Sequence, residues 1–184
     1  MVIKSQKIQT HSHSAGYTLI ILLFALTILI IGLLVAVPVW QTQIQREKEE
    51  ELLFRGNQYT EAIRLFQLKK PGTFPKTMDE LIEEKCIRRL YTDPMTKDGE
   101  WNIIVPYRRV SQKQKGSLPR VLIVPSSMLA GIDNPQIIGV VSASTQKSVK
   151  IYYEQESYDL WLFYFGRDPE KLPEITYYGQ EEKN

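Results

Sequence analysis

One stretch of the chain is apolar on every side, and it lies close to the N-terminus. From Leu19 to Val37 there is no charged residue, and only Thr27 and Gly32 interrupt the aliphatic and aromatic side chains. Nineteen residues of α-helix rise by roughly 28 Å, which is close to the hydrocarbon thickness of a bilayer. A helix without a polar face has no side to turn toward water, so it belongs in lipid or among similar helices. The pattern therefore predicts a transmembrane helix at residues 17–40.

Apolar positions then recur with the period of an amphipathic helix. Residues 41–70 contain no proline, and the breaker pair Pro71-Gly72 follows them. We therefore expect these residues to continue the helix into a folded domain, with Pro38 and Gly56 bending or loosening it. The predicted apolar face, with spacings of three, four and seven residues, consists of Leu52, Tyr59, Ala62, Ile63 and Phe66.

A second, short helix is indicated by its start signal. Thr77 to Glu80 have the capping-box pattern, in which the Thr77 hydroxyl accepts from the Glu80 amide and the Glu80 carboxylate reaches back to Thr77. Arg88 and Arg89 are expected in its last turn, where the helix macrodipole favours basic residues. The expected apolar face of this helix consists of Met78, Leu81, Ile82, Cys86 and Leu90.

After Glu100 the pattern changes to short runs of β-branched and aromatic residues separated by turn formers. The segments between the runs are too short for helical crossovers, so neighbouring strands are expected to be antiparallel. The predicted strands are Trp101–Tyr107, Val121–Pro125, Ile137–Ser142, Val149–Tyr153 and Tyr158–Phe165, with loops at Arg108–Gly116 and Ala130–Pro135.

These elements predict an α+β fold. A long N-terminal helix, membrane-spanning in its first half, packs on a small antiparallel β-sheet. About 145 residues follow the membrane segment, enough for one modest domain, which we place at residues 71–172. Residues 173–184, rich in Glu, Gln and Lys, are expected to form a flexible tail. Tyr177 and Tyr178 are expected to be half-buried residues of a sheet edge, with a contact patch as the alternative.

The charge of the chain excludes one class of partner. The formal net charge of +2 comes wholly from Lys4 and Lys7, because the remaining 21 basic residues balance 21 acidic ones. A nucleic-acid surface needs clustered, unbalanced Lys and Arg, so we expect no nucleic-acid partner.

The sequence also offers little for catalysis. Both histidines, His11 and His13, precede the apolar segment, so a chain cut before that segment would retain no Ser–His, Cys–His or His-based metal chemistry. No phosphate-binding Gly-rich loop and no nucleophile elbow appears. The lone Cys86 cannot close an internal disulfide and is expected to be a small buried apolar group. We therefore expect no enzymatic activity and no cofactor.

Three acidic residues are the candidate metal ligands. Asp93, Asp98 and Glu100 could offer oxygen atoms to Ca²⁺, but their spacing does not match an EF-hand loop. The pairs Asp-Pro and Asp-Gly are also ordinary turn formers. We therefore expect turns here, and no metal site.

The residues before the apolar run carry a family resemblance. Residues 1–16 are polar and basic without an acid, like an export signal, but the small residue suited to cleavage precedes the apolar run and does not follow it. The segment resembles the N-terminus of type IV pilins and type II secretion pseudopilins. The residues that match the family motif are Gly16, Tyr17, Thr18, Leu19, Ile20 and Pro38, the last of which stands 21 residues after Tyr17.

This resemblance implies how the chain is processed. It implies cleavage after Gly16 by the prepilin peptidase, so that residues 1–16 are a leader, and N-methylation of the new N-terminal Tyr17. It also implies the pilin-like version of the α+β fold. Residues 59–101 are similar, more loosely, to the corresponding stretch of major-type pseudopilins.

One position departs from the family motif. Most members carry a Glu after the aromatic-Thr-Leu-Ile run, and this chain has Ile21 there. In the family that carboxylate is thought to neutralise the N-terminal amine of a neighbouring subunit. A carboxylate at the centre of a membrane helix costs about 2.5–3.5 kcal/mol to insert, so it is retained only where it finds a partner. The departure favours a minor subunit over the bulk fibre subunit.

The functional prediction is therefore a non-enzymatic structural subunit of a type II secretion pseudopilus or type IV pilus-like fibre. Its expected partners are other pseudopilins or pilins, the prepilin peptidase and the inner membrane. We expect a single pass with the N-terminus in the cytoplasm and the folded domain outside. The alternative is a single-pass inner-membrane protein with an uncleaved signal anchor and an extracytoplasmic binding domain.

Overall fold

A computed structural model describes residues 14–107, 120–166 and 172–179. The chain divides into two compact units, Met1–Gln43 and Ile44–Asn184. Lys4, Lys7 and both histidines of the predicted leader lie outside the described residues, as does the predicted loop Arg108–Gly116.

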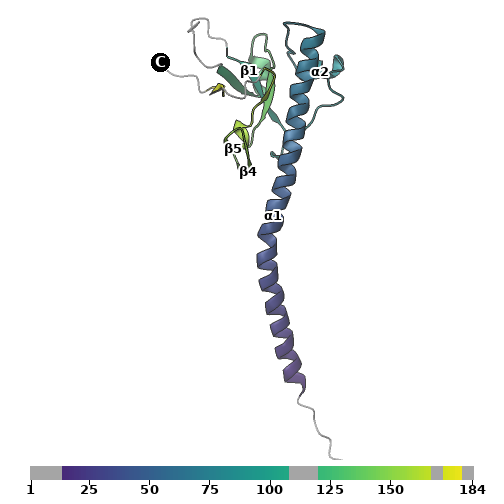
Figure 1. The fold of residues 1–184 in the computed structure, drawn as a ribbon, viewed down its shortest axis with the longest axis vertical. Coiled ribbons are helices and arrows are strands. Elements are labelled where there is room, and N and C mark those ends of the chain that lie inside the picture. The colour runs from purple at the N-terminus through teal and green to yellow at the C-terminus, as the bar shows by residue number, and fades with distance from the viewer. Residues whose placement is uncertain (1–13, 108–119, 167–171, 180–184) are drawn as a thin grey trace, which may run out of the picture. The chain divides into compact units, whose positions relative to one another are not determined.

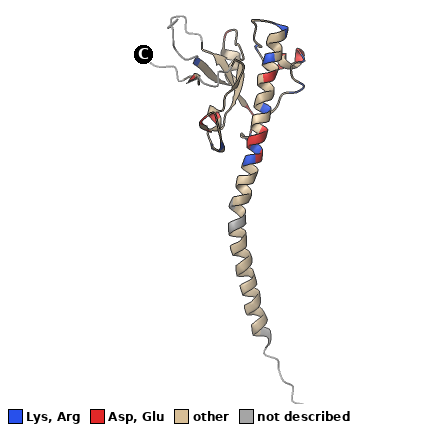
Figure 2. Ribbon diagram, viewed as in Figure 1, with Lys and Arg blue, Asp and Glu red and all other residues tan. Residues whose placement is uncertain are grey.

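One helix, α1, runs from Ser14 to Lys69 and contributes to both units (Figure 1). The helix assignment is uninterrupted at Pro38 and at Gly56, which confirms the predicted long helix. It begins three residues before Tyr17, where the membrane helix was predicted to start. Its charged residues are confined to the part that belongs to the second unit, beginning at Arg46 (Figure 2).

The second unit is built on a five-stranded sheet in the order β6-β3-β1-β2-β7. Neighbours pair antiparallel except β2 and β7, which pair parallel. A separate hairpin joins β4 to β5, and three short helices complete the unit. The strands are β1 (Trp101–Pro106), β2 (Arg120–Pro125), β3 (Gly139–Ser142), β4 (Lys147–Tyr152), β5 (Gln155–Ser157), β6 (Phe163–Tyr164) and β7 (Glu174–Tyr177); the short helices are α2 (Asp79–Glu83), η1 (Ser126–Gly131) and η2 (Tyr158–Leu160).

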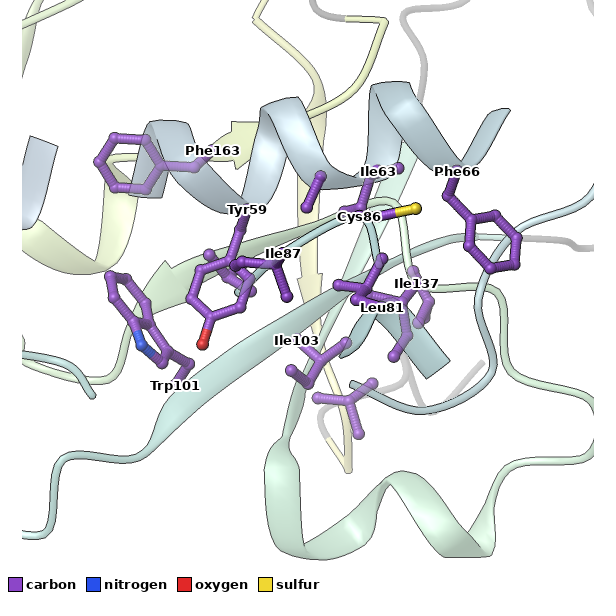
Figure 3. Close-up of a cluster of buried hydrophobic side chains, with 14 of the residues drawn as sticks. Tyr59, Ile63, Phe66, Leu81, Cys86, Ile87, Trp101, Ile103, Ile137 and Phe163 are labelled. Atoms are coloured by element: carbon purple, nitrogen blue, oxygen red, sulfur yellow. The ribbon is translucent and has the colours of Figure 1, made fainter. Parts of the chain in front are cut away.

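The predicted α+β fold, a long helix packed on a small, mostly antiparallel sheet, is confirmed. Side chains alternate across a strand. Trp101, Ile103 and Val105 of β1 therefore join the cluster that includes the buried face of α1, and Ile104 joins a second cluster on the other side of the sheet. Figure 3 shows the first cluster, with Tyr59 of α1 directed toward Trp101. All five residues of the predicted apolar face, Leu52, Tyr59, Ala62, Ile63 and Phe66, are buried.

Gly56 has a packing role that the sequence did not reveal. A Cβ atom at Gly56 would lie 2.4 Å from carbon atoms of the Phe163 ring in β6. The absence of a side chain therefore lets an aromatic ring rest directly on the backbone of α1. Helix α1 is uninterrupted at Gly56, and this close contact is what the glycine provides there.

The second helix is shorter than predicted. It ends at Glu83 because Lys85 adopts a left-handed conformation with φ 54°. The Lys85 amide donates to the Ile82 carbonyl and the Cys86 amide donates to the Leu81 carbonyl, which is the Schellman pattern of a helix end. Arg88, Arg89 and Leu90 therefore follow the helix and do not belong to it.

The predicted capping box is present only in part. The Thr77 hydroxyl accepts from the Glu80 amide at 3.3 Å, as predicted. The Glu80 carboxylate, however, accepts from the amide of Lys76 at 3.0 Å and not from that of Thr77. The position directly before the helix is Met78, whose side chain makes no capping hydrogen bond.

Several strand boundaries also differ from the prediction. The predicted strand Tyr158–Phe165 is divided between η2 and the two residues of β6. The predicted loop Ala130–Pro135 begins inside η1. The tail predicted at 173–184 is not wholly free, because Glu174–Tyr177 form β7 and pair with β2; residues 180–184 lie outside the described residues.

We predict that Gly56→Ala destabilises a fragment comprising residues 44–184. Overpacking costs about 1–3 kcal/mol, whereas the gain in helix propensity is about 1 kcal/mol, so the net effect is a loss of stability. Asn57→Ala, at the exposed neighbouring position, is the control and should change the free energy of unfolding by less than about 0.5 kcal/mol. Urea denaturation measures both, and an alanine variant as stable as the wild type would contradict the close ring contact.

Candidate functional site

The predicted processing site lies within α1. Gly16 and Tyr17 are helical, close to Ser14, the first residue that the structure describes. A Cβ atom added to Gly16 would meet no atom within 4 Å, and the Tyr17 side chain is 69 % exposed. Packing among the described residues therefore gives no reason for a glycine at position 16, and a substitution there leaves the rest of the fold intact.

The part of α1 from Leu19 to Val37 is apolar on all sides. Helix α1 is the one helix in the described part of the chain that is long and apolar enough to cross a membrane. Between Leu19 and Val37 the one side-chain hydroxyl is that of Thr27, and it donates to the Leu23 carbonyl at 2.8 Å. Thr27 therefore offers no unsatisfied proton to lipid. The large exposed apolar side chains of the motif region are Leu19, Ile20, Ile21, Leu22, Leu23 and Phe24.

The remaining motif positions are placed as follows. Ile21 is 51 % exposed and stands between other apolar side chains of α1. Residues 14–43 contain no Asp, Glu, Lys or Arg, so no side-chain charge of that segment lies near it. The backbone of Pro38 lies within α1, and its side chain is outside the described residues.

The second unit contains a buried carboxylate that the sequence did not predict. Glu49 of α1 is 0 % exposed. Its Oε1 atom accepts from the Val149 amide at 2.6 Å and from the Tyr158 hydroxyl at 2.7 Å, and its Oε2 atom accepts from the Lys150 amide at 3.1 Å. These hydrogen bonds of Glu49 therefore hold the β4–β5 hairpin against α1.

The residues around Glu49 complete the attachment. Gln45, one helical turn earlier, donates through Nε2 to the Tyr158 hydroxyl at 2.8 Å and to the Lys147 carbonyl at 3.0 Å. Burial raises the pKa of Tyr158 to about 12, so its hydroxyl keeps its proton and donates to Glu49. Gln45 and Glu49 precede Leu52, the first residue of the predicted apolar face, by seven and three residues. An acidic residue in register with that face was the available signal.

Two of the three candidate calcium ligands accept hydrogen bonds from other residues. The buried Asp93 accepts from the Ser142 hydroxyl at 2.7 Å and from the amides of Met95 and Ala143. Burial raises the pKa of the Asp93 carboxyl, and the nearby charge of Asp98 acts in the same direction. Glu100 accepts from the Ser126 hydroxyl at 2.6 Å. The described residues contain no group of three or more side chains able to hold a metal ion together.

Cys86 is buried, as predicted, and burial raises the pKa of its thiol. Tyr177 is half-buried in the edge strand β7, also as predicted, and its hydroxyl donates to Asp159 at 3.3 Å. Tyr178, directly after that strand, is 40 % exposed.

Comparison with known proteins adds no assignment. No protein-family model, curated protein or solved structure matches this chain.

We predict that Glu49→Gln loosens the hairpin. The amide group replaces one acceptor oxygen by a donor that faces a backbone N–H, and an unsatisfied buried donor costs about 1–3 kcal/mol. Glu50→Gln is the matched control, because Glu50 is the exposed neighbour that pairs with Lys150, and such surface pairs contribute little. Urea denaturation of the 44–184 fragment and hydrogen exchange at the Val149 and Lys150 amides measure the effect. If Glu49→Gln changed neither the free energy of unfolding nor the protection of these two amides, Glu49 would not be the residue that holds β4 against α1.

Proposed function

We propose that this chain is a structural subunit of a type II secretion pseudopilus or a related type IV pilus-like fibre. It enters the membrane as a precursor, is cut after Gly16 and acts without chemistry of its own. The proposal rests on two features that occur together. Residues Gly16 to Ile20 and Pro38 match the family motif at the family's spacing, and they lie in one long helix whose two parts have different surfaces. The first part of that helix is apolar and exposed, and the second part has a buried face packed on a sheet.

The exposed apolar surface supports a fibre or membrane role over a soluble one. Side chains such as Leu19 and Phe24 expose more than half of their surface, and water is a poor solvent for a helix of this kind. In a bilayer the segment lies among lipid tails, and in a fibre it lies among the same segments of other subunits. We place the short N-terminal side in the cytoplasm and the sheet domain outside the inner membrane.

Gly16 supports the processing step in particular. Glycine lowers helix stability by about 1 kcal/mol relative to alanine, and nothing within 4 Å of Gly16 requires it. The described fold places no demand on position 16, which leaves the residue there free to suit recognition by the peptidase.

An uncleaved signal anchor is the second candidate. It is favoured by the described extent of α1, which includes Ser14 and Ala15, because the helix crosses the predicted cut as it would in a protein that keeps its N-terminus. Mass spectrometry of the purified protein separates the two: the fibre subunit begins at Tyr17 with an N-methyl group, and the anchored protein begins at residue 1 or 2.

We predict that Gly16→Val leaves a full-length, membrane-bound precursor, because a peptidase cutting before the apolar run needs a small residue at the cut. Gly32→Val is the matched control, since a Cβ there also meets no atom within 4 Å. The Gly32 variant should be cut as the wild type is. A Gly16→Val chain that still begins at Tyr17 would place the cut elsewhere.

We also predict that the protein does not form long filaments by itself. Ile21 offers no carboxylate to the amine of a neighbouring Tyr17, and an unpaired buried ammonium costs several kcal/mol. A contact repeated along a fibre would suffer that cost at every subunit, which fits a minor subunit present in few copies. Electron microscopy of cells that overexpress this chain without other pseudopilins should show membrane-embedded protein only. Filaments of this chain alone would mean that another group neutralises the Tyr17 amine.

A further inference from the structure

The β4–β5 hairpin exposes apolar side chains on the second unit. Val149 and Ile151 stand on one face of β4, because side chains alternate along a strand, and they are 39 % and 68 % exposed. Tyr153, in the turn that follows, is 42 % exposed. The next residue, Glu154, is exposed, and its carboxylate forms no ion pair within the described part of the chain. The end of the hairpin is therefore an apolar surface with one uncompensated negative charge.

The backbone of this hairpin turn is strained. Tyr152 and Gln155 pair across it, so Tyr153 and Glu154 are its two central residues, and their φ angles are positive, 50° and 63°. Two-residue turns of this kind favour Asn-Gly, whereas a positive φ at a tyrosine is an outlier that costs free energy. Residues held in this way cluster at functional sites. Here they carry the exposed aromatic ring and the uncompensated charge.

A hollow of the opposite charge lies at the end of α2. Its lining residues are Ile82, Lys85, Cys86, Ile87 and Arg88. The apolar Ile82 is 39 % exposed. Lys85 and Arg88 are exposed, and neither forms an ion pair with another described residue. The nearby Glu84 is already paired with Lys70. The hollow thus combines an apolar floor with two uncompensated positive charges.

The two surfaces lie apart on the same unit. Figure 1 shows the hairpin and α2 on different sides of α1, and Glu49 holds the hairpin against that helix. One molecule therefore does not bring its own hairpin tip to its own hollow, and the matching partner for each surface is found on another copy.

We propose that the tip of the β4–β5 hairpin of one copy docks into the α2 hollow of a second copy. Ile151 and Tyr153 cover the apolar floor, and the Glu154 carboxylate pairs with Arg88 and Lys85 at the rim. Such charge complementarity fixes the orientation of the two copies more than it raises their affinity. This contact is a separate property from cleavage after Gly16 and does not depend on it.

The contact joins two different surfaces of the chain, so it is heterologous and leaves one hollow and one hairpin open in each pair. A hairpin tip covers far less than the roughly 1,200 Å² that stable complexes bury. The pairing is therefore weak in dilute solution and forms where copies are concentrated, as they are when anchored in one bilayer. So weak a contact does not offset the unpaired amine of Tyr17, which agrees with the expected absence of long filaments.

Crosslinking of the full-length chain in lipid vesicles tests which surfaces meet. Cys86→Ser removes the one cysteine of the sequence and is the background for Gln155→Cys, beside the tip, and Glu83→Cys, beside the hollow. A short bismaleimide should join these two variants when they are reconstituted together and give little product with either alone. Asp133→Cys, at an exposed position elsewhere, replaces the tip variant as the control and should give little product. No product in the mixture, or equal product in all samples, would overturn the proposal.

Charge reversal tests the ion pair within the same assay. Glu154→Lys and Arg88→Glu each bring like charges together and should lower the yield of crosslinked dimer about fivefold. A chain that carries both changes re-forms the pair with reversed signs and should recover most of the yield, whereas Asp133→Lys should leave it unchanged. A doubly reversed chain that crosslinks no better than the single variants would count against the docking.

Replacing the strained turn separates loss of the contact from loss of the fold. Tyr153→Asn combined with Glu154→Gly supplies the residues that the turn favours, so the midpoint of urea unfolding should rise while crosslinking is lost. The proposal is wrong if this variant crosslinks as the wild type does. A chain that is never cut after Gly16 would refute the proposed function and leave this contact standing.

Discussion

The fold of the second unit depends on covering one apolar face of α1. That face supplies Leu52, Tyr59, Ala62, Ile63 and Phe66 to the main cluster, and the facing side of β1 supplies Trp101, Ile103 and Val105 to the same cluster. Burying each large apolar side chain contributes about 1.5–3 kcal/mol, so these contacts dominate the attachment of helix to sheet. The same helix has no such cover in the first unit, where its large side chains are exposed. One continuous helix therefore requires two different surroundings, and this requirement underlies both the fold and the proposed function.

A small number of buried polar side chains hold the irregular segments in place. Buried backbone amides and carbonyls need partners, and the segment between α2 and β1 has no strand to provide them. The Tyr59 hydroxyl meets both the amide and the carbonyl of Tyr91 at 2.8 Å, and the indole of Trp101 donates to the same carbonyl at 2.9 Å. Asp93 binds the next turn through the Met95 amide. The aromatic residues of the core thus serve as hydrogen-bonding groups as well as packing groups.

Local patterns predicted the elements that local forces determine. The period of α1 and the β-branched runs of β1 and β2 are strong signals, and all three elements lie within a few residues of their predicted bounds. The end of α2 depends on the left-handed conformation of Lys85, which a residue other than glycine adopts only because of its surroundings. Strand β7 was missed because its partner β2 lies about fifty residues earlier in the sequence, where Arg120 pairs with Glu174. The Glu, Gln and Lys residues of the wider segment 173–184 indicated a tail, although Ile175, Thr176 and Tyr177 are themselves typical of strands.

The residues of the candidate site show the same difference between local patterns and long-range contacts. The motif residues Gly16 to Ile20 are contiguous, so a match to them can be seen in the sequence. The hydrogen-bond partners of Glu49, in contrast, lie about one hundred residues after Glu49 in the chain. Only the folded chain brings them together. The position of Glu49, three residues before Leu52, was visible in the sequence, but its burial and its partners were not.

The contact between Glu49 and β4 also bears on the solubility of the folded chain. A hairpin strand with free edge amides and exposed apolar residues is a template on which a strand of another molecule can pair. Strand β4 has such residues, Val149 and Ile151, with exposed fractions of 39 % and 68 %. The carboxylate of Glu49 accepts from the amides of Val149 and Lys150, which lie where the pairing of β4 with β5 is irregular. These two amides are therefore engaged by α1 and are not available to a strand of another molecule.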